Sequence, residues 1–283
     1  LSMNIFLSDL SEIYNSKLKG NYTRKKSIPG SISDKMTVNT TTNEEHLRKK
    51  NHTFWLNLLG LNPETSEFTP DFPRPSEKNY EGDVYIYQLP TNETELIQSF
   101  IRSQKISLYI FLQSCFQLLV YIHTRSENVI TGTLYHNRTT TEQFSTIGYF
   151  INNIVLSTNF THNITFSEIT SQVKDIFYAG INKAEIPYKD LVELIVTKRD
   201  ISRNPLFQLL FVLQKTAPEL LNLSELGSTI SELNPGYSKY DLSFYLEEKR
   251  KGIEIRVEYS TDLFREERIQ SLVSDFRRLV QLA

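Results

Sequence analysis

The spacing of apolar side chains in the first fifth of the chain predicts two helices separated by a polar tract. Apolar residues recur every three or four positions over residues 1–18 and again over residues 44–59, which is the period of an amphipathic helix. Residues 19–43 are polar and include Pro29, Gly30 and three consecutive threonines, a composition typical of a linker. We therefore expect helix, linker and helix in this order.

The middle of the chain alternates between extended and helical patterns. The stretch TPDFPRP at residues 69–75 holds three prolines, which forbid a helix and favour an extended crossing of the surface. The pattern then predicts a strand at 83–89, helices at 93–103 and 107–124, a β-rich run at 128–138 and a strand at 150–157.

The last third carries sharper signals for where elements begin. Thr165 and Glu168 have the spacing of a capping box and predict a helix running to about residue 183, whereas Pro187 is expected in the first turn of a helix over 187–198. Residues 206–214 read as a buried strand. Apolar and polar residues alternate over 241–248 and 252–260, which predicts strands with one solvated face, as in antiparallel or edge strands. An amphipathic helix starts at residue 265, so we expect an α/β fold with about six strands and flanking helices.

Composition and charge exclude several classes of function. Hydrophobic residues make up 39% of the 283-residue chain, charged residues 23%, and the formal net charge is -2, so no strong field attracts nucleic acid or anionic lipid. The longest apolar run, residues 107–122, is shorter than the roughly 20 residues that span a bilayer, and Gln113 and Gln117 interrupt it. We therefore predict a core helix, and neither a membrane nor a nucleic acid as partner.

The cysteine content and the first residues indicate a cytoplasmic protein. The start of the chain lacks the basic region and cleavage site of a secretory signal, so the N-x-S/T sequons are not assigned to glycosylation. The single cysteine, Cys115, lies in an apolar stretch and has no partner for an internal disulfide, which fits a reducing compartment.

No catalytic or metal-binding constellation is visible in the sequence. None of the five histidines has another histidine or cysteine at metal-ligand spacing, and phosphate-binding glycine motifs and the G-x-S-x-G motif are absent. Apolar surroundings would raise the pKa of Cys115 and make it a poor nucleophile. We therefore assign no catalytic residue and no metal ligand.

A cluster of polar residues directly precedes the apolar strand at 206–214. Arg199, Asp200, Arg203 and Asn204 stand before Pro205, which cannot donate a ladder hydrogen bond and is expected to mark the beginning of the strand. We interpret the cluster as a structural clamp, because guanidinium groups bond carboxylates and loop carbonyls at such boundaries. The alternative is a contact with a substrate tunnel or a carrier protein.

Several segments form an ordered series that resembles a known family. They are TGTLYHNRTT at 131–140, IGYFINN at 147–153, AEIPYKDLVE at 184–193, RDISRNPLFQ at 199–208, YDLSFYLEE at 240–248 and VEYSTDLF at 257–264. In sequence and order they resemble the condensation domain of nonribosomal peptide synthetases, and PDFPRP and FWLNLLG resemble earlier stretches of that family. The similarity covers essentially the whole chain.

The resemblance implies a fold and an activity. The family has a chloramphenicol-acetyltransferase-like fold of two α/β lobes with a tunnel between them, where amide bonds form between aminoacyl or peptidyl thioesters. Donor and acceptor peptidyl carrier proteins deliver these substrates on phosphopantetheine arms, beside an adenylation domain, and no cofactor is bound directly. The expected partners are these proteins.

The resemblance also implies a division of the chain. The family's H-H-x-x-x-D-G motif, which carries the catalytic histidine, is absent, and the first ten residues resemble those that follow it. The chain would then be a fragment or a truncated product. Residues 1–43 would form the last helix of the N-terminal lobe plus a linker, and residues 44–283 the C-terminal lobe. We expect such a chain to be inactive without the N-terminal lobe and to self-associate through an exposed apolar face.

The resemblance assigns candidate tunnel residues. Asn152 falls on the family's asparagine and could hold a substrate carbonyl or pantetheine amide, or else cap a strand; Asn153 replaces a threonine, and Gly148 permits a turn or a close approach to a tethered substrate. Arg138 is read as a solvated loop arginine, with a phosphate contact as the alternative. The family's H-Q-D-x-P-F-E motif is only partly kept. Glu185, Pro187 and Tyr188 stand at its Asp, Pro and Phe positions, whereas Lys183 and Lys189 replace its His and Glu.

Three other functions remain open at this point. The chain could be a non-catalytic carrier-binding module, an epimerisation relative, or another acyltransferase of the superfamily that uses a coenzyme A thioester. FINN at residues 150–153 favours a condensation domain over an epimerisation domain, because the latter usually carries aromatic and Ser/Thr residues there.

Overall fold

A mixed β-sheet organises most of the chain. The computed structural model describes residues 1–22, 42–184, 186–215, 221–228, 233–249 and 252–283. The chain divides into two units, which we describe separately. The first comprises Leu1–Lys49, His136–Ile151 and Ala217–Leu233, and the second comprises Lys50–Tyr135, Asn152–Thr216 and Asn234–Ala283.

The sheet belongs to the second unit and combines antiparallel and parallel pairs. Its order is β1-β6-β5-β4-β2-β3, with β1 antiparallel to β6, β6 to β5 and β2 to β3, whereas β4 runs parallel to β5 and β2. The strands are β1 Gly82–Gln88, β2 Asn128–Tyr135, β3 Asn152–Asn159, β4 Leu209–Lys215, β5 Leu242–Lys249 and β6 Gly252–Ser260. This mixed sheet with flanking helices confirms the predicted α/β class.

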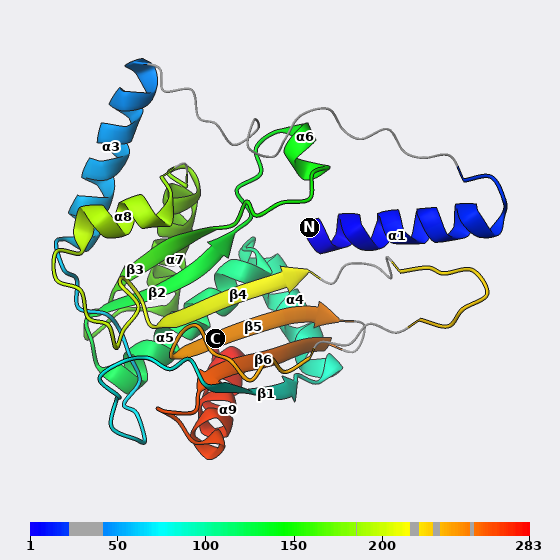
Figure 1. Ribbon diagram of the computed structural model, residues 1–283. Helices are drawn as coiled ribbons and strands as arrows, with labels where there is room; N and C mark the ends of the chain where they lie inside the picture. Colours follow the sequence, from blue (N-terminus) through cyan, green and yellow to red (C-terminus); the bar gives the residue numbers. More distant parts are fainter. Residues whose placement is uncertain (23–41, 185, 216–220, 229–232, 250–251) are drawn as a thin grey trace. The chain divides into compact units, whose positions relative to one another are not determined.

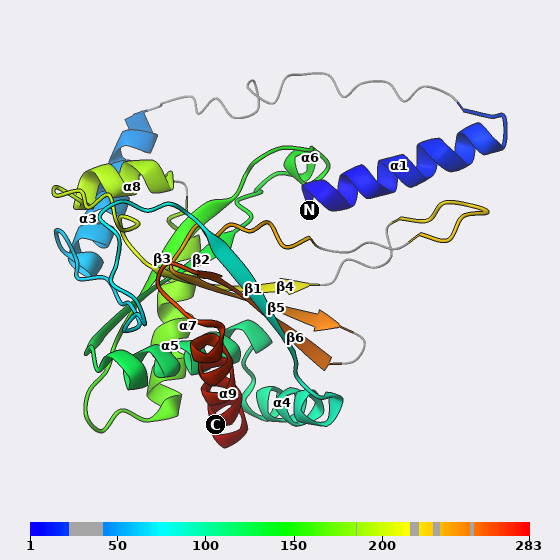
Figure 2. The same cartoon turned by 60° about the horizontal axis from the view of Figure 1, so that its bottom comes forward.

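Four helices cover one face of the sheet, as Figures 1 and 2 show. They are α4 Thr91–Gln104, α5 Leu108–Thr124, α7 Phe166–Ile181 and α9 Glu266–Leu282. The side chain of Phe116 on α5 lies 5.3 Å from Phe211 of β4 and 5.0 Å from Phe244 of β5 between ring centroids. The predicted core helix is therefore confirmed, and its apolar face forms the centre of the larger core.

A second core lies around β2, β3 and β4 and takes side chains from both faces of β3, since the neighbouring residues Ile154 and Val155 both belong to it. It includes Trp55 from α3 (Thr42–Leu59) and Leu191 from α8 (Tyr188–Ile195). The ring of Phe207 stacks on Tyr240 with centroids 5.0 Å apart and lies against Gly132 of β2. This aromatic pair therefore takes the space that a side chain at position 132 would need.

Two helix starts agree with the sequence signals. The Thr165 hydroxyl accepts a hydrogen bond from the Glu168 backbone N–H, and the Glu168 carboxylate accepts one from the Thr165 backbone N–H at 2.7 Å, which confirms the capping box. The Ser107 hydroxyl accepts from the Ile110 backbone N–H and caps α5.

Helix α8 differs from the prediction at both ends. Pro187 has φ −57° and ψ 141°, so it is the extended residue before the helix and not part of its first turn. The helix ends at Ile195 because the Asn62 side-chain oxygen accepts the backbone N–H groups of Thr197 and Lys198, which turns the chain away. Asn62 lies 135 positions before Thr197, so the local pattern could not indicate this stop.

The predicted strand at 206–214 begins later than expected. Pro205 does not mark its first residue, because β4 starts at Leu209. The Gln208 side chain bonds back to Asn204, accepting from its backbone N–H at 3.0 Å and donating to its carbonyl at 2.8 Å. A closed turn therefore separates the proline from the strand. Strand β3 likewise begins at Asn152, two residues after the predicted start.

The solvated faces predicted for β5 and β6 are only partly present. Both strands are interior, since β5 lies between β4 and β6, and β6 lies between β5 and β1. Ser243 is buried, and Arg256 and Glu258 are largely shielded and paired with each other at 2.8 Å. Alternation identified the strands but could not place them in the sheet order.

The first unit is built on α1 (Ser2–Leu18). The Asn15 amide donates to the Asn222 carbonyl at 2.8 Å and accepts from the Ser224 N–H at 2.8 Å, while the Ser11 hydroxyl accepts from the Asn222 N–H at 3.0 Å. A short helix, α6 (Thr141–Phe144), is closed by a Thr140–Gln143 capping box. Most of the predicted linker, residues 23–41, lies outside the described residues, as does Glu185.

Within the described residues, no single helix is long and apolar enough to cross a membrane; the bent pair of α4 and α5 meets the length and composition criteria only when taken together.

Candidate functional site

Asn152 uses all of its hydrogen-bonding capacity within the chain. Its side-chain amide donates to the Ala184 carbonyl at 2.9 Å and the Ile186 carbonyl at 2.7 Å, and its oxygen accepts from the backbone N–H groups of Asn153 and Tyr188, both at 3.0 Å. An amide offers two donors and two acceptor positions, so none is left over. The geometry gives this buried residue the role of holding the connection between α7 and α8 against β3, and a substrate contact stays a prediction.

Asn153 keeps part of its hydrogen-bonding capacity unused. Its side-chain amide donates to the Tyr240 hydroxyl at 3.3 Å, and its side-chain oxygen accepts no hydrogen bond from the described residues. It stands next to an aromatic group in which Phe207 contacts both Tyr240 and Tyr188. Burial raises the pKa of the Tyr188 phenol, so this hydroxyl stays protonated. Of the two asparagines, only Asn153 retains an acceptor for a ligand.

Gly148 belongs to the first unit and is bonded to α1. The Ser2 hydroxyl donates to the Gly148 carbonyl at 2.8 Å and accepts from the Gly148 N–H at 3.2 Å. Gly148 is not among the glycines with positive φ. Its conformation is therefore open to other residues, and the predicted approach to a substrate remains a prediction.

Arg138 is buried, so its interpretation as a solvated loop arginine is wrong. Its guanidinium donates to the backbone carbonyls of Gln143 and Thr146 and to the Ser2 hydroxyl, and it lies 4.2 Å from the ring of Phe150. Burial lowers the pKa of this guanidinium. The side chain closes the loop between β2 and β3 on itself, and the phosphate contact stays a prediction.

The polar cluster before β4 forms a charge network. Arg203 donates to the Asp200 carboxylate at 2.8 Å and to the Glu67 carboxylate at 3.1 Å. The other Asp200 oxygen accepts from the hydroxyl and backbone N–H of Ser202 at 2.6 and 2.8 Å. These Ser202 bonds, together with Arg203, lower the pKa of Asp200 to about 2.

The network extends to residues that sequence analysis did not select. Arg74 donates to Glu67 at 2.6 Å, to the Ser202 carbonyl at 3.2 Å and to both oxygens of Asp241, whose carboxylate is also 3.7 Å from the Lys78 ammonium. Arg74 stands in PDFPRP and Asp241 in YDLSFYLEE. The sequence could have pointed to both residues, because each is a charged residue inside a segment that resembles the family.

The network places the four predicted clamp residues differently. Asp200 and Arg203 bond each other, Arg203 also bonds Glu67, and Asn204 donates to the Lys239 carbonyl at 3.0 Å. Arg199 is exposed and has no bond to another described side chain. The arrangement supports a clamp role for three of the four residues, whereas Arg199 faces a pocket.

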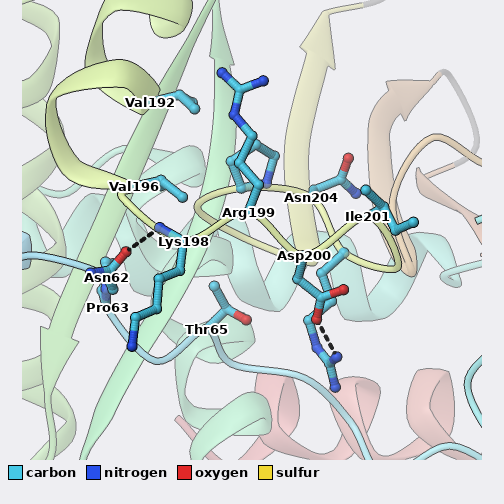
Figure 3. Close-up of a pocket in the computed structure, with 12 residues that line it drawn as sticks. Asn62, Pro63, Thr65, Val192, Val196, Lys198, Arg199, Asp200, Ile201 and Asn204 are labelled. Carbon is cyan, nitrogen blue, oxygen red and sulfur yellow. Dashed lines mark hydrogen bonds and ion pairs between the residues drawn. The ribbon is translucent and has the colours of Figure 1, made fainter. Parts of the chain in front are cut away.

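A pocket of about 340 Å³ lies beside the network (Figure 3). The loop after α3, the end of α8 and the turn before β4 contribute its walls, which comprise Asn62, Pro63, Thr65, Val192, Val196, Lys198, Arg199, Asp200, Ile201, Arg203, Asn204 and Pro205. The aliphatic side chains of Val192 and Val196 come from one helix end, and the charged groups come from the loop that follows it. The pocket therefore combines an apolar wall with a cationic border.

The described residues contain no group of three His, Cys, Asp or Glu side chains arranged to hold a metal ion. Cys115 is fully buried in the core, and burial raises the pKa of its thiol, as the sequence predicted.

Comparison with known proteins places the chain in a family. The family model described as "Condensation domain" matches residues 1–283. The chain belongs to the condensation-domain family. This confirms the predicted resemblance, and the epimerisation alternative is not favoured.

Condensation-domain relatives include peptide synthases. The chain is 27% identical over 284 residues to one of the linear gramicidin synthase proteins of Brevibacillus parabrevis and 28% identical over 233 residues to tyrocidine synthase 3 of the same organism. It is also 28% identical over 236 residues to a dimodular nonribosomal peptide synthase of Bacillus subtilis (strain 168). These matches cover 99%, 82% and 81% of this chain but only 4%, 4% and 10% of the relatives. The chain therefore corresponds to a small part of such proteins.

Solved structures support the condensation-domain fold. The X-domain from teicoplanin biosynthesis superimposes with a TM-score of 0.85 at 19% identity, covering 99% of this chain and 65% of that one. A four-domain nonribosomal peptide synthetase bound to AMP and glycine gives a TM-score of 0.80 at 19% identity, covering 99% of this chain and 22% of that one. At this identity the likeness confirms the fold alone.

Proposed function

We propose that this chain takes part in amide-bond formation between two carrier-bound substrates of a nonribosomal peptide synthetase. The observation that carries the proposal is the condensation-domain match over the whole of residues 1–283, together with relatives that are named as peptide synthases. In this reaction an acceptor amine attacks the carbonyl carbon of a donor thioester, the amide bond forms, and the donor thiolate leaves. A base must take the proton of the attacking amine.

The proposal gives this chain the C-terminal lobe of the domain. Residues 44–283 would form that lobe, and residues 1–43 the last helix of the N-terminal lobe with its linker. The support is the order of the sequence segments and the sheet of the second unit, which brings several of them together. The base, an imidazole of the H-H-x-x-x-D-G motif, would come from outside these residues. The contribution of this chain is then proximity, since a tunnel wall turns an encounter of two tethered substrates into a positioned one.

The proposal also assigns partners. Donor and acceptor carrier proteins would present phosphopantetheine arms to the tunnel, and an adenylation domain of the same cytoplasmic synthetase would load them. Asn153 would contact a tethered substrate, because its side-chain oxygen remains an acceptor. Gly148 is a separate candidate, which rests on its place in the segment IGYFINN. Asn152 would act indirectly by holding the α7–α8 connection.

The test uses two carrier proteins loaded with aminoacyl thioesters. Mass spectrometry of the acceptor carrier should detect no dipeptidyl product with the 283-residue chain alone, and should detect product when a polypeptide carrying the preceding lobe is added. Product from the chain alone would contradict the lobe assignment. Absence of product in the complete mixture, across a panel of loaded amino acids, would contradict amide formation itself.

A further inference from the structure

The pocket beside the charge network carries two cations, Lys198 and Arg199, that have no carboxylate partner among the described residues. The described residues supply no ion pair to the side chains of Lys198 and Arg199, both of which are exposed. Arg203, by contrast, is already bonded to Asp200 and Glu67. The charge of the pocket available to a ligand is therefore positive, although the whole chain carries a formal net charge of -2.

The two free cations lie on different sides of the pocket. Figure 3 shows the Arg199 side chain pointing toward the Val192 side and the Lys198 side chain pointing toward Pro63 and Thr65. One small carboxylate would therefore engage one cation only, whereas an extended chain with two acidic groups can engage both.

The space between the cations is apolar. Val192 and Val196 from the end of α8 and Pro205 from the turn before β4 form its wall, and Ile201, which is 67% exposed, lies at the border. A volume of about 340 Å³ accommodates an aliphatic side chain with adjoining backbone. Pockets of this type obtain affinity from apolar contact and orientation from a few charged groups.

The local hydrogen bonds fix the pocket before any ligand arrives. The Asn62 oxygen accepts the N–H groups of Thr197 and Lys198, and its amide donates to the Thr197 hydroxyl at 2.8 Å. On the opposite side, the bonds between Asn204 and Gln208 close the turn. A ligand would therefore have to order only the two long cationic side chains.

We propose that this pocket binds an extended acidic segment of a partner protein, with one aliphatic side chain against Val192 and Val196 and flanking carboxylates paired to Lys198 and Arg199. The inference does not depend on amide formation, because it rests on the pocket and its charges. The expected partner segment contains an acidic, an aliphatic and an acidic residue, in this order.

The probe is a fluorescein-labelled peptide of the form Gly-Glu-Leu-Glu-Gly, blocked at both ends, with fluorescence anisotropy as readout against the 283-residue chain. Lys198→Gln combined with Arg199→Gln should weaken binding about tenfold, since two exposed ion pairs are lost. The matched control, Lys174→Gln with Arg278→Gln, removes the same charge from exposed positions elsewhere and should bind like the unaltered chain. Thermal midpoints of all chains are expected to agree.

Two altered peptides separate the contributions. A Gln-Leu-Gln version should lose binding as the double variant does, and a Glu-Ser-Glu version should bind more weakly because the apolar wall loses its contact. Added salt should weaken binding of the acidic peptide, since its charges are exposed. Equal binding by the double variant and the control would overturn the proposal. So would displacement of the peptide by sodium octanoate at equal concentration, which would favour a small carboxylate as the natural ligand.

Discussion

Gly132 is required at its position because of one aromatic ring. A Cβ atom there would lie 2.1 Å from a ring carbon of Phe207, which is fully buried and stacked on Tyr240 and cannot move aside. Gly132→Ala should therefore lower the free energy of unfolding by about 1–3 kcal/mol in urea denaturation. Gly227→Ala is the control, because nothing lies within 4 Å of a Cβ at that position. Equal midpoints for the two variants would contradict this packing.

Asn152 and Asn153 are adjacent, yet their substitution should have different effects. Asn152→Ala leaves the buried carbonyls of Ala184 and Ile186 and the N–H of Tyr188 without partners, and should cost about 1–3 kcal/mol or more in urea denaturation. Asn153→Ala removes one bond of 3.3 Å and should cost about 1 kcal/mol or less. A larger loss of stability for Asn153→Ala than for Asn152→Ala would show that Asn153, and not Asn152, holds the α7–α8 connection.

Residue roles were the least predictable part of the site. The sequence located Asn152 but could not indicate that its amide is saturated, because its partners Ala184, Ile186 and Tyr188 lie 32 to 36 positions later in the chain. Arg138 was misread for the same reason, since Ser2, 136 positions away, helps to bury its guanidinium. Local pattern therefore finds a residue of interest, whereas tertiary contacts decide what it does.

At the scale of elements, Asp241 links the start of β5 to the loop between α3 and β1, through Arg74 and Lys78. Its buried carboxylate pairs with Arg74 and lies 3.7 Å from the Lys78 ammonium. Removing it leaves Lys78 with no carboxylate partner among the described residues and Arg74 with Glu67 as its remaining one. Asp241→Ala should lower the free energy of unfolding by about 3–5 kcal/mol. Glu193→Ala breaks an exposed pair with Lys189 on α8 and should change stability by about 0.5 kcal/mol or less. Similar urea midpoints for both variants would show that the network contributes little.

The contact between α4 and α9 predicts a pH dependence. The Arg277 guanidinium donates to both oxygens of Glu93, and this hydrogen bonding holds the pKa of the Glu93 carboxyl below its usual value. A lowered folded-state pKa gives stability that is fully present above the unfolded pKa of about 4.3 and is lost as the pH falls below it. Thermal midpoints of Glu93→Gln should therefore lie below those of the unaltered chain at pH 7, and the difference should shrink toward acidic pH.

The control for this titration is Glu193→Gln, an isosteric change in the exposed pair of α8. Its difference from the unaltered chain should stay small and constant between neutral and acidic pH. If the difference in thermal midpoint between Glu93→Gln and the unaltered chain also stayed constant with pH, titration of Glu93 would not be the cause of the stability difference.

Elements were largely predictable, whereas their arrangement was not. Periodicity found all six strands and the main helices, and the Thr165–Glu168 capping box fixed the start of α7. The strand order β1-β6-β5-β4-β2-β3 depends on crossovers that no local pattern encodes. Alternation predicted antiparallel or edge strands for β5 and β6: the two strands do pair antiparallel, but neither is an edge strand.

At the scale of the whole molecule, the two units carry different parts of the proposed activity. The second unit holds the sheet, the charge network and Asn153, and the first holds the loop closed by Arg138 and carrying Gly148. The residues of the charge network lie around a strand start and satisfy one another. Under the proposed function, this chain would supply positioning, and the proton transfer would come from a separate lobe.

Exposed apolar side chains of the first unit predict self-association. Met3 and Phe6 on α1 are 63% and 51% exposed, and Tyr149 is 74% exposed. Apolar groups that cluster at the surface of a soluble protein usually mark an interaction site, so the isolated chain should bind copies of itself through them. Light scattering after size exclusion should give a mass that rises with concentration between about 5 and about 100 μM. Met3→Glu with Phe6→Glu should shift that mass toward the monomer, whereas Leu282→Glu, at an exposed position on α9, should not. A monomer at every concentration would contradict self-association through these exposed side chains.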